Sequence, residues 1–302
     1  MYKMKTADIF ASEIAGFLEA ELIGRDFIVR GPSSWRRMID NTFVRADESG
    51  LDEHGFQSHK DVLVLASRLP VVQTDSISFL VVKEPHIKFI DVLNEFFIEF
   101  DEVKIAPSAT IDKSARLGQG VAVGENVVIG PDVTIGDGTR ILNNVVITGR
   151  VQVGEKCLIK HNSTVGSTGY DFEVDVQGRQ VHFPHVGKII IGDHVWIGSN
   201  SSIESSAIHE TVIEDMVKID DLVQIGANSV IRAGAMITAG AIISRGVEIG
   251  KNCLIAPNAS VRDSVKIGDH VTLGIGAVAL KDLKSHGVYV GNPAVFLKER
   301  DN

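Results

Sequence analysis

Residues 213–249 read IEDMVKIDDLVQIGANSVIRAGAMITAGAIISRGVEI, and an isoleucine stands at every sixth position of this stretch. The same spacing runs from Ile105 to Val165 and returns from Ile191 to Ile203; after a slip of four residues it holds from Ile213 to Leu273. A period of six fits neither a helix nor a long strand. It predicts short strands joined by turns, with three hexads closing one triangular coil and coils stacked about 4.8 Å apart as parallel strands.

The positions of each hexad have separate predicted roles. The aliphatic residue is expected to point toward the axis, and the Gly or Asp that often follows it is expected to take a corner at positive φ. The fifth residue is usually small and is expected to be buried. Cys157 and Cys253 occupy this position, so we predict inert core thiols rather than a disulfide or a zinc site.

The repeat is interrupted twice, at residues 166–190 and at residues 207–212. A rigid column needs no such excursions for its stability, whereas loops that leave a rigid scaffold commonly carry function. We therefore predict that both interruptions form walls of a cleft.

The first 100 residues lack the repeat. Ile14, Phe17 and Leu18 are spaced for one helix face, DVLVLA and SISFLVV read as strands, and IKFIDVLNEFF reads as a second helix. The predicted organisation is a small α/β domain over residues 1–100, a β-helix over residues 101–284 and a C-terminal tail over residues 285–302.

Composition narrows the class of protein. The chain has 302 residues and a formal charge of −9, which argues against a nucleic-acid partner. It has no apolar run long enough to span a membrane, and its start, MYKMKTADIF, lacks the apolar core of a signal peptide. These features predict a cytoplasmic protein.

The hexapeptide repeat resembles that of the left-handed β-helix acyltransferases. The order of LEAELIG, GSTGYDF, VGKIIIGDHVWIG and QIGAN is similar to that of the UDP-3-O-acylglucosamine N-acyltransferases. This resemblance implies a left-handed helix, a homotrimer with sites between prisms, a nucleotide-binding small domain and an acyl carrier protein as donor. The histidine that acts as base in that family aligns with Ala227.

Two further alignments complete the resemblance. The Phe of the family's uracil pocket aligns with Phe43, while Ala46 and Ser49 stand where its Asn and Tyr are expected. The ending Gly291-Asn292-Pro293-Ala294 resembles that of coenzyme A-dependent acetyltransferases of the same fold.

The predicted function is acyl transfer from a thioester to the amine, rather than a hydroxyl, of a nucleotide-linked amino sugar in glycan or lipopolysaccharide synthesis. No tightly bound cofactor is expected, and acyl-CoA is favoured over acyl carrier protein as donor. Two alternatives stay open: the lipid A pathway N-acyltransferase itself, and a trimeric scaffold of the same fold that has lost catalysis.

The candidate site residues follow from stacking and from the interruptions. His209 lies in the short interruption, close to the register of Ala227, and is the predicted base, oriented by Asp215 or Glu210. The other candidates are Asn228 for catalysis; Phe43, His161, Tyr170, Phe172, His182 and His185 for substrate; and Arg245, Lys281, Asn292 and Lys298 for the donor. For each loop residue the alternative is an ordinary solvated side chain.

Overall fold

The structure is a computed structural model that describes residues 2–5, 7–46, 51, 59–71, 75–100 and 104–300. Ser49, which enters the uracil-pocket comparison, lies outside these residues. The chain divides into two compact units, Met1–Glu102 and Val103–Asn302.

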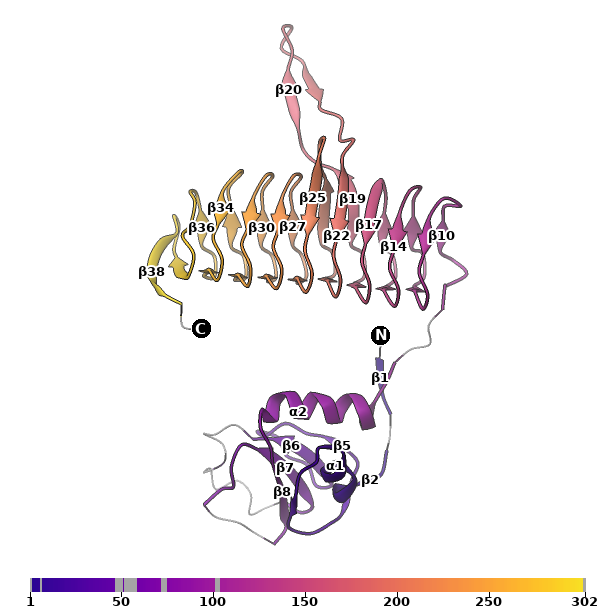
Figure 1. The fold of residues 1–302 in the computed structure, drawn as a ribbon, viewed down its shortest axis with the longest axis vertical. Helices are drawn as coiled ribbons and strands as arrows, with labels where there is room; N and C mark the ends of the chain where they lie inside the picture. The colour runs from indigo at the N-terminus through magenta and orange to yellow at the C-terminus, as the bar shows by residue number, and fades with distance from the viewer. Residues whose placement is uncertain are drawn as a thin grey trace. The chain divides into compact units, whose positions relative to one another are not determined.

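The first unit is built on a five-stranded mixed sheet with the order β3-β8-β7-β6-β5 (Figure 1). Its strands are β3 (Leu22–Ile23), β5 (Gly31–Pro32), β6 (Thr42–Arg45), β7 (Val62–Ala66) and β8 (Ile77–Val81). The remaining elements are β1 (Tyr2–Met4), β2 (Ile9–Phe10), α1 (Ala11–Phe17), β4 (Ile28–Val29), α2 (Pro85–Val92), the π-helical turn η2 (Leu93–Phe97) and β9 (Ile98–Phe100). The predicted small α/β domain is confirmed.

Alternation along the sheet strands separates two apolar layers. Phe43, Leu63 and Leu65 pack with residues of α1 and η2, whereas Val44 and Val64 belong to a second cluster. Successive strand residues point to opposite faces, so both faces of this sheet are apolar and both must be covered.

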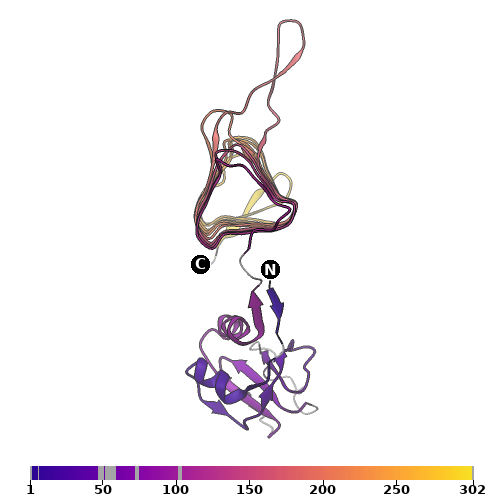
Figure 2. The ribbon, with the colours of Figure 1, turned by 90° about the vertical axis from the view of Figure 1, so that its right-hand side faces the viewer.

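The second unit is a triangular prism of parallel strands, seen along its axis in Figure 2. Its first face comprises β10 (Thr110–Ile111), β13 (Val128–Ile129), β16 (Val146–Ile147), β19 (Thr164–Thr168), β24 (Ser202–Ser205), β27 (Gln224–Ile225), β30 (Ile242–Ile243), β33 (Ser260–Val261) and β36 (Val278–Ala279). Its second face comprises β11 (Arg116–Leu117), β14 (Thr134–Ile135), β17 (Arg150–Val153), β22 (Lys188–Ile191), β25 (Glu210–Ile213), β28 (Val230–Ile231), β31 (Glu248–Ile249) and β34 (Lys266–Ile267). Its third face comprises β12 (Ala122–Val123), β15 (Arg140–Ile141), β18 (Leu158–Ile159), β23 (Trp196–Ile197), β26 (Lys218–Ile219), β29 (Met236–Ile237), β32 (Leu254–Ile255), β35 (Thr272–Leu273), β37 (Gly287–Val290) and β38 (Val295–Glu299).

The coils stack in the register that the repeat predicts. Ile225 pairs with Ile243, 18 residues on, and their side chains meet in the continuous core of the prism. Cys157 and Cys253 lie in that core, and burial raises the pKa of the Cys253 thiol to about 11. The predicted inert core thiols are therefore consistent with their environment.

One predicted role within the hexad is wrong. Positive φ falls on the fourth residue, such as Asn228, Gly234 and Gly240, and not on the Gly or Asp that follows the aliphatic residue. The Gly that follows serves close packing instead, because a Cβ on Gly226 would lie 2.6 Å from the backbone nitrogen of Arg245 in the next coil. The fourth position of the hexad therefore requires a residue that adopts positive φ, and the second position favours glycine because a side chain there would collide with the next coil.

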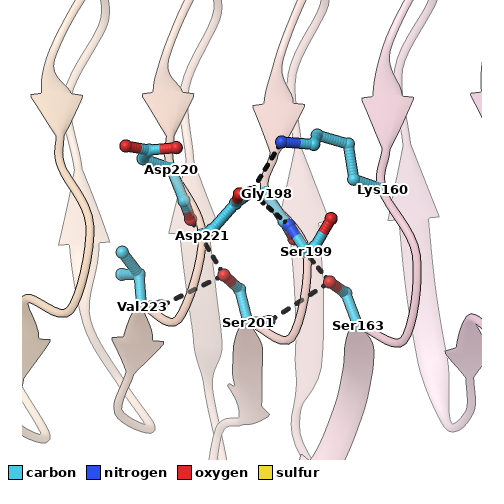
Figure 3. A network of polar contacts seen from close by, with 8 residues as sticks. All are labelled: Lys160, Ser163, Gly198, Ser199, Ser201, Asp220, Asp221 and Val223. Atoms are coloured by element: carbon cyan, nitrogen blue, oxygen red, sulfur yellow. Dashed lines mark hydrogen bonds and ion pairs between the residues drawn. The ribbon is translucent and has the colours of Figure 1, made fainter.

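Buried hydroxyl groups join successive coils at several fifth positions, as Figure 3 shows for Ser163 and Ser201. Ser163 donates to the carbonyl oxygen of Gly198 and accepts from the backbone of Ser201, 3.2 Å away. Ser201 repeats the pattern, donating to Asp220 O at 2.9 Å and accepting from Val223 N at 3.1 Å. Each hydroxyl therefore bonds two backbone groups of the next coil, which an aliphatic side chain at the same position cannot do.

The segment predicted to be a separate tail is continuous with the prism. β37 pairs in parallel with β35, and β38 turns back antiparallel to β37. The last strands therefore close the end of the third face.

Candidate functional site

Both interruptions of the repeat leave the prism at one corner. The long one follows β19 and forms an antiparallel hairpin of β20 (Phe172–Val174) and β21 (Gln180–His182) before β22 begins. The short one joins β24 to β25 on the next coil, where Ile203 pairs with Ile225, 22 residues on. Figure 2 shows the hairpin rising from this corner, which we call the hairpin corner: the edge between the first and second faces.

The hairpin corner carries a column of side chains on successive coils. Each lies two residues beyond a paired aliphatic residue of the first face: Ser205, Ala227, Arg245, Asp263 and Lys281. The predicted donor residues Arg245 and Lys281 thus share one edge with Ala227, the position that aligns with a base in the resemblance.

A row of rings leads along the hairpin to this column. Tyr170 is 85% exposed, and its ring centroid lies 5.0 Å from that of Phe172. Phe172 lies 5.1 Å from His182, which stacks on His185 at 5.9 Å with an interplanar angle of 17°. Four residues predicted to bind substrate are therefore in consecutive contact, from solvent to the prism wall.

His185 ends the row and is held against the prism backbone. Its Nδ1 lies 2.7 Å from the carbonyl oxygen of Ser205 and 3.1 Å from the backbone nitrogen of Gly169. Only one of these contacts can be a hydrogen bond, and an unprotonated Nδ1 would face the Ser205 oxygen lone pair to lone pair. The shorter contact therefore assigns the proton to Nδ1 and leaves Nε2 as an acceptor.

The Nε2 atom of His185 is buried and has no hydrogen-bond partner within the part of the chain that the structure describes. Buried polar atoms without partners are rare in folded proteins, and each calls for an explanation. A buried acceptor without a partner is one that a ligand's N–H or O–H group could fill once the chain around it shifts.

Ala227 and the Glu204 carboxylate lie beside the same ring. A Cβ on Gly169 would lie 2.7 Å from His185 Cε1, 2.8 Å from Glu204 Oε2 and 3.4 Å from Ala227 Cβ. Glu204 accepts hydrogen bonds from Gln224 Nε2 at 3.0 Å and from Ala227 N at 3.2 Å. The absence of a side chain on Gly169 thus lets a histidine, a carboxylate and the Ala227 position converge.

A groove of about 450 Å³ runs along the hairpin corner, lined by Tyr170, Asp171, Phe172, Glu204, Gln224, Gly226, Ile242, Ser244, Arg245 and Asp263. An ion pair of 2.7 Å between Asp171 and Arg245 ties the hairpin to the column. The groove therefore combines an aromatic wall, one guanidinium group and the carboxylates of Asp171, Glu204 and Asp263.

Asn228 and His209 belong to the short excursion. Asn228 Oδ1 accepts from the Ser206 hydroxyl and from Ala207 N at 3.2 Å, so this side chain fixes the excursion's shape. His209 is exposed, and its ring makes no hydrogen bond or ion pair with any described residue. Its predicted orienting residues are bonded elsewhere, Glu210 to Lys188 at 3.4 Å and Asp215 to Asp193 N at 2.8 Å.

The remaining predicted residues are not among those that line the groove. His161 stands at the corner between the third and first faces, where its Nδ1 accepts from Asn143 N at 3.2 Å. Phe43 is fully buried in the first unit, with its ring 4.6 Å from that of Phe89, so a substrate role would require that core to open. Asn292 and Lys298 are exposed at the end of the third face.

Residue types alone did not reveal three members of the groove, namely Asp171, Glu204 and Gln224. Only the place of Glu204 in the repeat could have indicated a role for it. It stands just before the short excursion, at the hexad position where most hexads carry Gly or Asp. Across the described ranges no group of three His, Cys, Asp or Glu residues is arranged to hold a metal ion.

Family models match three parts of the chain. The bacterial transferase hexapeptide model (six repeats) matches residues 246–278, the hexapeptide repeat of succinyl-transferase matches residues 188–209, and the GMPPB C-terminal domain matches residues 105–183. The second unit is a left-handed parallel β-helix of hexapeptide repeats.

Relatives and solved structures agree with this fold. A UDP-3-O-acylglucosamine N-acyltransferase of Coxiella burnetii is 34% identical over 76 residues, which is 25% of this chain and 22% of the relative. This chain thus matches about a fifth of the length of that relative. A UDP-N-acetylglucosamine acyltransferase from Campylobacter jejuni aligns at 20% identity with a TM-score of 0.59, over 65% of this chain and 75% of that one. The Francisella novicida UDP-N-acetylglucosamine acyltransferase aligns at 21% identity with a TM-score of 0.58, over 65% of this chain and 69% of that one.

The hexapeptide β-helix therefore resembles that of acyltransferases, as the sequence predicts. None of the helices in the described residues has the length and apolar character needed to cross a membrane.

Proposed function

We propose that this protein transfers an acyl group from a thioester donor to the amine of a nucleotide-linked amino sugar, within glycan or lipopolysaccharide synthesis. The observation that carries the proposal is the groove at the hairpin corner, which is lined by the Glu204 carboxylate and the Arg245 guanidinium group. The ring of His185 lies against Glu204 and Gly169 behind this groove, and its Nε2 atom is buried without a hydrogen-bond partner among the described residues. An amine that attacks a thioester needs a proton acceptor and two substrates held together, and the groove offers both kinds of group.

The curated relative supports the amine as acceptor. The name of that relative, UDP-3-O-acylglucosamine N-acyltransferase, describes N-acyl transfer to a UDP-linked sugar, and its match to this chain is a partial one. Amide formation is therefore proposed ahead of ester formation, and the cytoplasm is the proposed location.

The donor proposal favours acyl-CoA, with acyl carrier protein as the alternative. Arg245 and Lys281 lie on one edge of the prism, on either side of Asp263, and Arg245 also pairs with Asp171. Cations on this edge suit the phosphates of a pantetheine-bearing donor. Asn292 and Lys298 are further donor candidates, at the end of the third face. A homotrimer that places a second prism along the groove completes this proposal.

The direct test is transfer by the purified full chain. We expect an amide product by mass spectrometry when UDP-glucosamine is mixed with acyl-CoA donors from acetyl to myristoyl, or with the corresponding acyl carrier proteins. The ratio of kcat/KM between the two donor types separates the alternatives. Absence of product with every donor contradicts the proposal.

A scaffold without catalysis is the second candidate, favoured by Ala227 at the aligned base position and by the burial of Phe43. Calorimetric titration with coenzyme A and UDP-glucosamine distinguishes it. A scaffold predicts no heat of binding for either ligand, whereas the proposed enzyme predicts binding of both.

A further inference from the structure

We infer that His185, supplied by the inserted hairpin, is the general base that accepts the proton of the attacking amine. This inference rests on the proposed acyl transfer and assigns the role of proton acceptor to one nitrogen atom of one residue. It differs from the prediction for His209, the histidine nearest to Ala227 in the repeat register.

The first argument is the tautomer, which is inferred from the two contact distances of His185 Nδ1 to Ser205 O and Gly169 N. The contact of 2.7 Å to the Ser205 carbonyl oxygen places the proton on Nδ1, so Nε2 presents its lone pair. A histidine that donates from one nitrogen to a fixed carbonyl group has its other nitrogen oriented for proton transfer. The short excursion after Ser205 is itself held by Asn228, so the carbonyl group that orients the ring is anchored.

The second observation is the unused acceptor. Nε2 of His185 is buried, and none of the described residues donates a hydrogen bond to it. The exposed ring of His209 has no comparable anchor. Because Nε2 is buried, an acceptor amine reaches it only when the chain segments that cover it shift.

The third observation is the electrostatic setting. The Glu204 carboxylate and His185 Cε1 both lie within 2.8 Å of the point where a Gly169 side chain would begin. Both Glu204 oxygens already accept hydrogen bonds, from Gln224 and from Ala227 N, which leaves the carboxylate less suited to take the proton itself. A negative charge beside the ring stabilises the imidazolium that forms. The titratable groups that face His185 are Glu204 and, on the hairpin, His182.

The step balances as follows. The amine nitrogen forms a bond to the thioester carbonyl carbon while its proton passes to His185 Nε2. The carbon–sulfur bond then breaks, and the imidazolium returns the proton to the leaving thiolate. The products are an amide and a free thiol, and His185 regains its starting form.

The decisive variant is His185→Asn. An asparagine amide can still donate to the Ser205 carbonyl oxygen, as Nδ1–H does, but has no counterpart of Nε2. We expect kcat to fall about 10²- to 10⁴-fold, while donor KM and the thermal midpoint stay close to those of the wild type. The matched control is His194→Asn, which changes an exposed histidine at the corner between the second and third faces and should leave kcat unaltered.

The pH profile distinguishes a base from a merely structural residue. Wild-type kcat/KM should fall on the acid side, because a protonated base accepts no proton, and His185→Asn should remove this limb. If wild type forms amide and His185→Asn keeps both the limb and kcat within threefold, the inference is wrong while the proposed function stands. Loss of activity in His209→Ala, with His185→Asn active, also overturns it. A wild type that forms no amide with any donor overturns the proposed function and the base together.

Discussion

The hairpin is tied to the prism by the Asp171–Arg245 ion pair, and Asp171→Ala should loosen it measurably. The two side chains are 19% and 51% exposed and their charged atoms lie 2.7 Å apart. Partly exposed ion pairs contribute about 0.2–1 kcal/mol. Removing one partner should therefore raise the equilibrium constant for hairpin opening about 1.4- to 5-fold.

Amide hydrogen exchange of the hairpin peptide covering residues 172–182 measures this change. When closing is faster than exchange, the exchange rate scales with the opening constant, so we expect rates about 1.4- to 5-fold higher in Asp171→Ala. The double-mutant cycle with Arg245→Ala isolates the pair from other effects of each substitution. Salt at about 1 M should reduce the difference, since the screening length falls to about 3 Å.

The result that refutes this reasoning is unchanged exchange in Asp171→Ala together with zero coupling to Arg245→Ala. In that case the β20–β21 pairing or the His185 anchor holds the hairpin without help from the ion pair.

Three other changes test separate parts of the structure. Ser201→Ala leaves Asp220 O and Val223 N without their partner, so urea unfolding should show a loss of about 1–3 kcal/mol. Hydrogen bonds from Lys160 and from Ser199 N lower the pKa of Asp221. The ionised Asp221 should therefore stabilise the folded chain at neutral pH, and this contribution should be lost as pH falls below the ordinary aspartate range. Asp221→Asn should flatten that part of the plot of unfolding free energy against pH. Gly169→Ala places a methyl group 2.7 Å from His185 Cε1, so kcat should fall by as much as about 10²-fold while circular dichroism is unaltered.

The prism could be predicted almost completely from sequence because its period is visible in one residue class. An aliphatic residue at every sixth position sets strand, turn and stacking at once, and Ile203, Ile225 and Ile243 pair as the repeat requires. The corner geometry was less visible, because the left-handed fourth position is occupied by residues as different as Asn228, Leu222 and Met216. Residue chemistry gives no common signal there, so the turn was assigned to the wrong place in the hexad.

The site could be predicted only to the level of its loops. Register placed the short interruption near Ala227, but the fold of the long one depends on pairings that no periodic pattern encodes, such as Phe172 with His182. The return of His185 to the Ser205 carbonyl group follows from that hairpin. Phe43 was predicted as a substrate residue from a motif alignment alone. Such an alignment does not show that its ring is buried between other rings of the first unit.

The measurement that tests the central claim most directly is the tautomer of His185, observed by long-range proton–nitrogen NMR correlation on the full chain with labelled histidine, assigned by comparison with His185→Asn. The structure predicts that the neutral ring carries its proton on Nδ1 and not on Nε2, with the Nε2 resonance changing when UDP-glucosamine is added. A neutral ring protonated on Nε2, or a ring indifferent to the sugar nucleotide, would contradict a base poised at the hairpin corner.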